Sequence, residues 1–143
     1  MHMPVEMATH DLLVERIDAP YWQVLADTNA AAIIAIPLLK PNGCTGLTEL
    51  SDALALGKPI LMTRNPYIDA DIEAIGCGRW IPVGDLGAWT TAISELMADP
   101  ELRRSMGARG RALAEESWNY EMFGTALTTA VTRVGTSPRP TRR

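Results

Sequence analysis

The sequence predicts an α/β fold in which a parallel sheet is flanked by helices and followed by a helical C-terminus. Three short apolar runs, each bounded by a turn or a breaker residue, are typical of strands buried on both faces. Amphipathic helical patterns lie between and after these runs. Such alternation favours right-handed crossovers, and ligands of such sheets bind at the carboxyl ends of the strands.

The predicted strands are short. Residues 33–36 are rich in β-branched side chains and end at Pro37, and residues 59–63 and 78–83 are similar apolar runs. Residues 21–29 suit a short helix that leads into the first strand. A further strand at residues 14–17 is an interpretation of the segment VERI.

The predicted helices have recognisable ends. Leu47, Leu50 and Leu54 share one helical face, and Gly57 with Pro59 ends that helix. Three further helices are predicted to begin at the N-cap residues Asp85, Asp99 and Asn119. Their apolar faces are predicted to contain Leu86, Trp89, Ile93 and Leu96 in the first, Leu102, Met106 and Leu113 in the second, and Tyr120, Phe123, Leu127 and Val131 in the last.

Composition narrows the class of protein. The 143 residues are 47% hydrophobic and 21% charged, which is typical of one globular domain. The formal net charge of −4 argues against a nucleic-acid partner. No stretch approaches the roughly 20 apolar residues of a membrane span, so no transmembrane segment is expected. Cys44 and Cys77 lack the spacing of a metal site, which indicates a reduced, cytoplasmic chain without a metal.

We divide the chain into three parts. Residues 1–10 lack a signal-peptide core and are expected to be a flexible leader or an expression remnant. Residues 11–134 are expected to form the domain. Residues 135–143 are rich in proline and arginine and predict a disordered tail.

The glycine-containing turn at residues 41–46 joins the first strand to the next helix. Its backbone amides and the positive end of the helix dipole suit a phosphate group. Thr48 offers a hydroxyl, and the carboxylate of Asp52 is placed to accept hydrogen bonds from ribose. The alternative is a purely structural turn followed by a solvated helix face that carries Glu49 and Asp52.

The stretch GLTELSDALALGKPILMT, residues 46–63, resembles the donor-binding element of GT-B glycosyltransferases, especially the retaining, group 1-like enzymes. Asp52 stands where a glutamate is usual, and Gly57, Lys58 and Pro59 match the Gly-x-Pro stop. The later motifs VGD, DPELR and MGARGR follow in the order of that family. The resemblance covers about residues 12 to 134 and implies part of a Rossmann-like C-terminal domain, truncated at its N-terminal side.

The resemblance also implies a donor site. Gly46, Leu47 and Thr48 would bind the diphosphate of a nucleotide sugar, and Asp52 would bind its ribose. Cys44 occupies the position of a family glutamate that contacts the donor sugar. The implied sugar pocket contains Asn42, Gly43, Cys44, Thr45 and Glu49, and the implied surroundings of the nucleobase contain Arg16 and Ile17. No cofactor or metal is expected, and no residue is assigned a catalytic role.

The function implied is transfer of a sugar from a nucleotide-diphosphate sugar to an acceptor, by a chain that alone would be incomplete and inactive. Two alternatives stay open. One is a fragment of another GT-B enzyme, such as a nucleotide-sugar epimerase. The other is a non-catalytic module that forms homo-oligomers through an open sheet edge.

Residues outside this element have simpler interpretations. The arginines of residues 103–111 are interpreted as a solvated helix face balanced by Glu115 and Glu116. Cys77 is expected to be a buried small apolar residue. The tryptophans at positions 22, 80, 89 and 118 are predicted to lie in the core.

Overall fold

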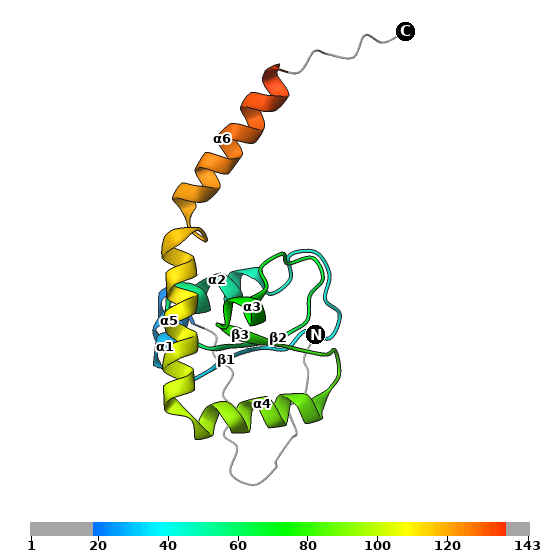
Figure 1. Cartoon of the computed structure of the whole chain (residues 1–143), viewed down its shortest axis with the longest axis vertical. Helices are drawn as coiled ribbons and strands as arrows, with labels where there is room; N and C mark the ends of the chain where they lie inside the picture. Colours follow the sequence, from blue (N-terminus) through cyan, green and yellow to red (C-terminus); the bar gives the residue numbers. More distant parts are fainter. Residues whose placement is uncertain (1–18, 137–143) are drawn as a thin grey trace.

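A computed structural model describes residues 19–136 of the chain (Figure 1). Strands β1 (Ile34–Ile36), β2 (Ile60–Thr63) and β3 (Gly78–Ile81) form a parallel sheet in the order β1-β2-β3. The α/β prediction is therefore confirmed, in a Rossmann-like arrangement. The predicted leader, the possible strand at residues 14–17 and residues 137–143 of the predicted tail lie outside the described residues.

Five of the six helices within residues 19–136 follow the predicted pattern. The exception is the four-residue α3, whose N-terminus is capped by Asp71; this carboxylate accepts hydrogen bonds from the amides of Glu73 and Ala74. A single turn carries too little periodicity to be predicted. The helices are α1 (Tyr21–Ala30), α2 (Leu47–Ala55), α3 (Ile72–Ile75), α4 (Leu86–Ala98), α5 (Pro100–Glu116) and α6 (Tyr120–Thr136).

The sheet separates two apolar clusters, because successive side chains of a strand point to opposite faces. Ile60 and Met62 of β2 pack in the cluster that includes Leu50 of α2. Leu61, between them, packs with Leu96 of α4 in the other cluster. Figure 1 accordingly shows α2 and α3 on one face of the sheet and α4 on the other.

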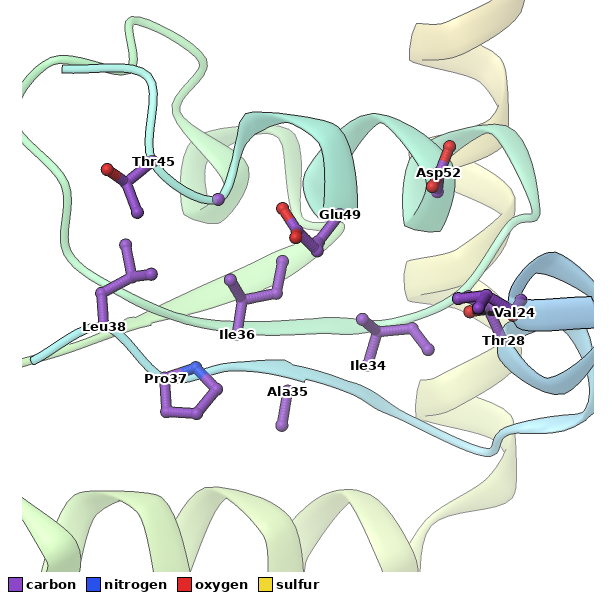
Figure 2. A pocket seen from close by; sticks show the side chains of 11 residues that line it. Val24, Thr28, Ile34, Ala35, Ile36, Pro37, Leu38, Thr45, Glu49 and Asp52 are labelled. Atoms are coloured by element: carbon purple, nitrogen blue, oxygen red, sulfur yellow. Dashed lines mark hydrogen bonds between the residues drawn. The ribbon is translucent and has the colours of Figure 1, made fainter. Parts of the chain in front are cut away.

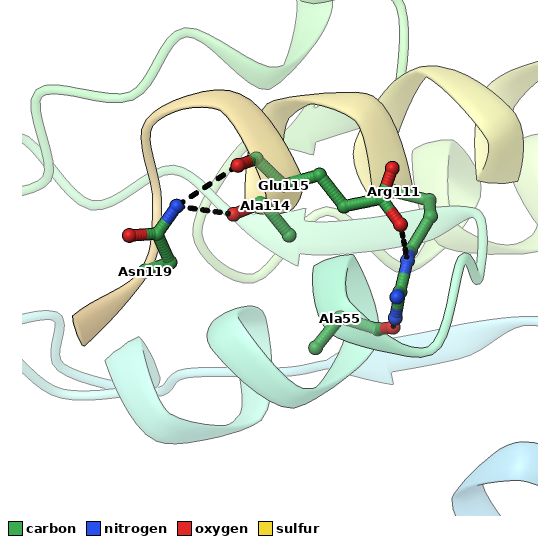
Figure 3. Close-up of polar contacts among 5 residues, drawn as sticks. All are labelled: Ala55, Arg111, Ala114, Glu115 and Asn119. Carbon is green, nitrogen blue, oxygen red and sulfur yellow. Dashed lines mark hydrogen bonds and ion pairs between the residues drawn. The ribbon is translucent and has the colours of Figure 1, made fainter. Parts of the chain in front are cut away.

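Helix α5 packs against the end of α2 that lies farthest from the predicted ligand site. A Cβ atom at Gly107 would collide with the backbone carbonyl of Gly57, in the turn between α2 and β2. The guanidinium of Arg111 donates to the carbonyl of Ala55 at the end of α2 and to Glu115 (Figure 3). Helix α5 therefore does not cover the carboxyl ends of the strands, where a ligand is expected.

Some predicted core positions are wrong. Trp22 is 68% exposed, because α1 contributes no buried residue and its outer side is uncovered. Leu86 is 77% exposed, since the face that α4 turns to the sheet is made by Ala92 and Leu96. The other three tryptophans are partly buried against the two clusters.

Helix α6 extends away from the sheet (Figure 1). Asn119 makes the junction, because its Nδ2 donates to the carbonyls of Ala114 and Glu115 of α5 (Figure 3) while its Oδ1 accepts from the amide of Met122 in α6. The predicted apolar face is therefore present but exposed, with Tyr120 at 94%. Within residues 19–136, no helix has the length and hydropathy needed to cross a membrane.

Candidate functional site

A cavity of about 300 Å³ lies along one edge of β1, between α1 and α2 (Figure 2). Among the described residues β1 pairs with β2 alone, so its other edge is open. Ile34, Ile36 and Leu38 supply apolar surface to the cavity. The polar groups come from the two helices and from the turn before α2, and the residues concerned are Thr28, Thr45, Gly46, Glu49 and Asp52.

The turn before α2 requires glycine. Gly46 has a φ of +84°, and a Cβ atom there would lie 2.6 Å from Cε of Met62. Thr45 closes the turn, because its hydroxyl donates to the backbone carbonyl of Asn42 at 2.6 Å. A side chain at position 46 would thus strain the backbone and displace the core beneath it.

Asn65, in the loop after β2, holds the same turn, and no motif in the sequence marks this residue. It lies just after β2 and is 2% exposed. Its Nδ2 donates to the carbonyls of Gly43 and Thr45 at 3.2 and 3.0 Å. Its Oδ1 accepts from the amide of Tyr67 at 3.1 Å. A short polar side chain within two residues of the carboxyl end of a buried strand is the signal that would have marked it.

The N-terminus of α2 has no side-chain cap. The amide of Leu47 donates to the carbonyl of Cys44 at 3.0 Å, so this predicted phosphate ligand is already engaged. The amides of Gly46 and Thr48 have no acceptor among the described residues. Two of the three predicted donors are thus available to an anion, which the helix dipole favours at this position.

Glu49 and Asp52 line the cavity together, whereas Thr48 does not. The hydroxyl of Tyr21, in α1, donates to Oδ1 of Asp52 at 2.7 Å. This hydrogen bond raises the pKa of Tyr21 above its ordinary value. The wall formed by α2 therefore carries two carboxylates, one of which is tied to α1.

The remaining predicted residues lie apart from the cavity lining. Asn42, Gly43 and Cys44 belong to the turn, where Cys44 is exposed. Arg16 and Ile17, the predicted neighbours of a nucleobase, lie outside the described residues. The structure thus gathers Thr45, Gly46, Glu49 and Asp52 of the predicted set around one space.

Two curated relatives share part of their sequence with this chain. It is 30% identical over 112 residues to a GDP-mannose-dependent monoacylated alpha-(1-6)-phosphatidylinositol monomannoside mannosyltransferase of Corynebacterium glutamicum, over 75% of this chain and 29% of that protein. The chain is glycosyltransferase-like. A second relative is the GDP-mannose-dependent alpha-(1-6)-phosphatidylinositol monomannoside mannosyltransferase of Mycolicibacterium smegmatis, 30% identical over 76 residues.

The second match covers 53% of the glycosyltransferase-like chain and 20% of its relative, so the chain spans less than a third of the length of either mannosyltransferase. No family model matches it. No solved structure matches it either. The resemblance inferred from the motifs is nevertheless confirmed by these two proteins.

Proposed function

We propose that this chain binds the nucleoside diphosphate of a sugar donor and forms the donor-binding part of a glycosyltransferase. One observation carries the proposal: the lining of the cavity along β1 includes Gly46, at the uncapped start of α2, and two carboxylates of α2. The names of the two relatives support GDP-mannose as the donor and a phosphatidylinositol mannoside as the class of acceptor.

The diphosphate would bind at the start of α2. The amides of Gly46 and Thr48 supply hydrogen bonds, and the helix dipole adds partial positive charge. A diphosphate leaving group gathers negative charge as the glycosidic bond breaks, so these oriented amides would stabilise the transition state.

The ribose would bind further along α2. Asp52 lies four residues beyond Thr48, which is about 6 Å along the helix axis. Its carboxylate accepts hydrogen bonds, as the carboxylates that hold ribose in dinucleotide folds do. Glu49 lines the same cavity and is the carboxylate that we assign to the donor sugar.

Two other functions use the same features. A nucleotide-sugar epimerase would need the same diphosphate turn, but both relatives are named as transferases. A non-catalytic, self-associating module is favoured by the open edge of β1, since unpaired backbone groups recruit a further strand.

Titration of ¹⁵N-labelled chain with GDP or UDP, followed by NMR, tests the proposal. The amides of Gly46 and Thr48 are expected to shift first, because they would bind the diphosphate. The N-terminus of α4 is an internal control, since the carboxylate of Asp85 already accepts from the amide of Ala88 at 2.8 Å. Shifts confined to the arginines of α5 would instead indicate nonspecific attraction of charge and would contradict the proposal.

A further inference from the structure

One hydrogen bond joins the two helical walls of the cavity. Tyr21 is the first residue of α1, and its hydroxyl donates to Oδ1 of Asp52 in α2 at 2.7 Å. Val24 and Thr28, one and two turns further along α1, line the cavity (Figure 2). Within residues 19–136, no other side-chain hydrogen bond connects α1 to the rest of the chain. Helix α1 itself has no buried residue.

The bond occupies only part of the carboxylate. A carboxylate offers about four acceptor positions on its two oxygens. Among the described residues, Oδ2 of Asp52 has no hydrogen-bond donor, so this oxygen is available to a ligand. The side chain of Asp52 would otherwise rotate among several rotamers on the surface of α2. Holding one oxygen restricts where the other can lie.

The hydroxyl of Tyr21 is the hydrogen-bond donor to Oδ1 of Asp52. A tyrosine hydroxyl is protonated at neutral pH, and the hydrogen bond to Asp52 raises the pKa of Tyr21 further above its ordinary value. A charge-assisted O–H···O⁻ bond is shorter and stronger than one between neutral groups. Tyr21 is 58% exposed, so this bond lies at the mouth of the site rather than in the core.

We propose that Tyr21 is a positioning residue of the ribose subsite: it holds Oδ1 of Asp52 so that Oδ2 is presented to a ribose hydroxyl. The inference rests on the proposed function, in which Asp52 binds ribose. It adds a residue from α1 to a site otherwise built on the turn before α2 and on α2 itself. Preorganisation of this kind increases affinity because less rotamer freedom is lost on binding.

Calorimetric titration of the whole chain with GDP and with 2′,3′-dideoxy-GDP tests the proposal. Tyr21→Phe is expected to lower the affinity for GDP about threefold to tenfold, the usual effect of one hydrogen bond. The same change should leave the affinity for the dideoxy compound nearly unaltered, because that ligand has no hydroxyl for Asp52. Tyr67→Phe is the matched control, since Tyr67 is exposed and its hydroxyl has no hydrogen bond among the described residues.

The variant Asp52→Asn distinguishes a failure of the inference about Tyr21 from a failure of the proposed function. If Asp52→Asn weakens GDP selectively while Tyr21→Phe leaves GDP binding unchanged or tighter, Tyr21 does not position Asp52 and the inference is overturned alone. If Tyr21→Phe weakens both ligands equally, Tyr21 only places α1, and the inference again fails. If Asp52→Asn affects both ligands equally, or the unaltered chain binds neither, both the assignment of Asp52 to ribose and the inference about Tyr21 fail.

A double variant completes the test. In the Asp52→Asn background, Tyr21→Phe should have no further effect on GDP affinity, because the two residues act through one carboxylate. Equal losses in both backgrounds would show independent roles and overturn the inference. Melting temperatures of the unaltered chain, the two single variants and the double variant are measured by circular dichroism. They identify any variant whose loss of binding reflects loss of folding.

Discussion

At the scale of single residues, the site depends on side chains that do not face its cavity. Asn65 satisfies two carbonyl groups of the turn before α2, and both would otherwise be left without these hydrogen bonds. Thr63, also 2% exposed, accepts from the amide of Leu38 and ties the ends of β1 and β2 together. The glycine turn is therefore held from β2, and its conformation is not a property of the turn alone.

Asn65→Ala is expected to lower the free energy of unfolding by about 1–3 kcal/mol, because the three hydrogen bonds of this buried side chain are lost. It should also weaken GDP binding, because the amides of the turn lose their support. Urea denaturation and GDP titration measure the two effects. Asn29→Ala, at an exposed position of α1, is the control, and equal behaviour of the two variants would show that Asn65 does not hold the turn.

The two carboxylates of α2 should differ in what they bind. Asp52→Asn is expected to weaken GDP binding by about 1.5–3 kcal/mol, the range for hydrogen bonds to charged groups. Glu49→Gln should leave GDP affinity unchanged and weaken only the additional binding of GDP-mannose, because Glu49 would face the sugar. Calorimetry with both ligands checks this. If Glu49 carries the whole loss for GDP, the ribose position lies one helical turn earlier.

The two thiols should react at very different rates. Cys44 is exposed in the turn, whereas Cys77 is fully buried. Burial also raises the pKa of the Cys77 thiol, which reduces its reactive thiolate form. With a chromogenic disulfide reagent at pH 8, one thiol per chain should react rapidly and the second only after addition of denaturant. Two equal rates would contradict the placement of Cys77 in the core.

At the scale of elements, two glycines of α5 allow it to pack closely against α2 and the turn that follows α2. Gly107 and Gly110 let α5 approach the turn after α2 and the side chain of Leu54. Asp99 caps α5 by accepting from the amide of Leu102 at 2.9 Å. Because α5 packs against the turn between α2 and β2, it does not line the cavity at the edge of β1.

Two glycines in helices allow a matched comparison. Gly107→Ala is expected to destabilise the chain by about 1–3 kcal/mol, since the added methyl group would overlap the carbonyl of Gly57 and α5 would have to shift. Gly124→Ala, in α6, meets no atom within 4 Å and should stabilise the chain by about 0.5–1 kcal/mol through helix propensity. Thermal unfolding measures the change in stability of each variant. If both variants were stabilised, or both destabilised, close packing of α5 against Gly57 would be contradicted.

At the scale of the whole molecule, two surfaces lack a partner among the described residues. One is the open edge of β1, next to the exposed side chain of Ala35. The other is the apolar face of α6, where Phe123, Leu127 and Val131 are all exposed. Both are features that soluble chains normally cover.

We expect the chain to self-associate through the edge of β1. Light scattering at high micromolar concentration should show dimers or larger species. Ala35→Lys should reduce the association, because a charged side chain on an edge strand opposes pairing. Leu127→Glu, on the face of α6, should leave it unchanged. A clean monomer would contradict the prediction, and a loss of association in the Leu127 variant alone would assign the contact to α6.

The sequence by itself determined the parts of this protein that depend on neighbours along the chain. The helix over Leu47, Leu50 and Leu54 and the N-caps Asp85 and Asp99 could be predicted because periodicity and capping act within a few residues. The order of the motifs was likewise enough to indicate the resemblance to glycosyltransferases, which the two relatives confirm.

Only the tertiary structure decided which residues meet. Asn65 reaches Gly43 and Thr45 across 22 and 20 residues, and Tyr21 reaches Asp52 across 31. No local pattern encodes such pairs, because they depend on how α1 and β2 lie beside the turn and α2. The same holds for α6, whose apolar face was predicted from its periodicity although its exposure was not. Periodicity shows that a helix has an apolar side, but burial of that side requires another surface against it.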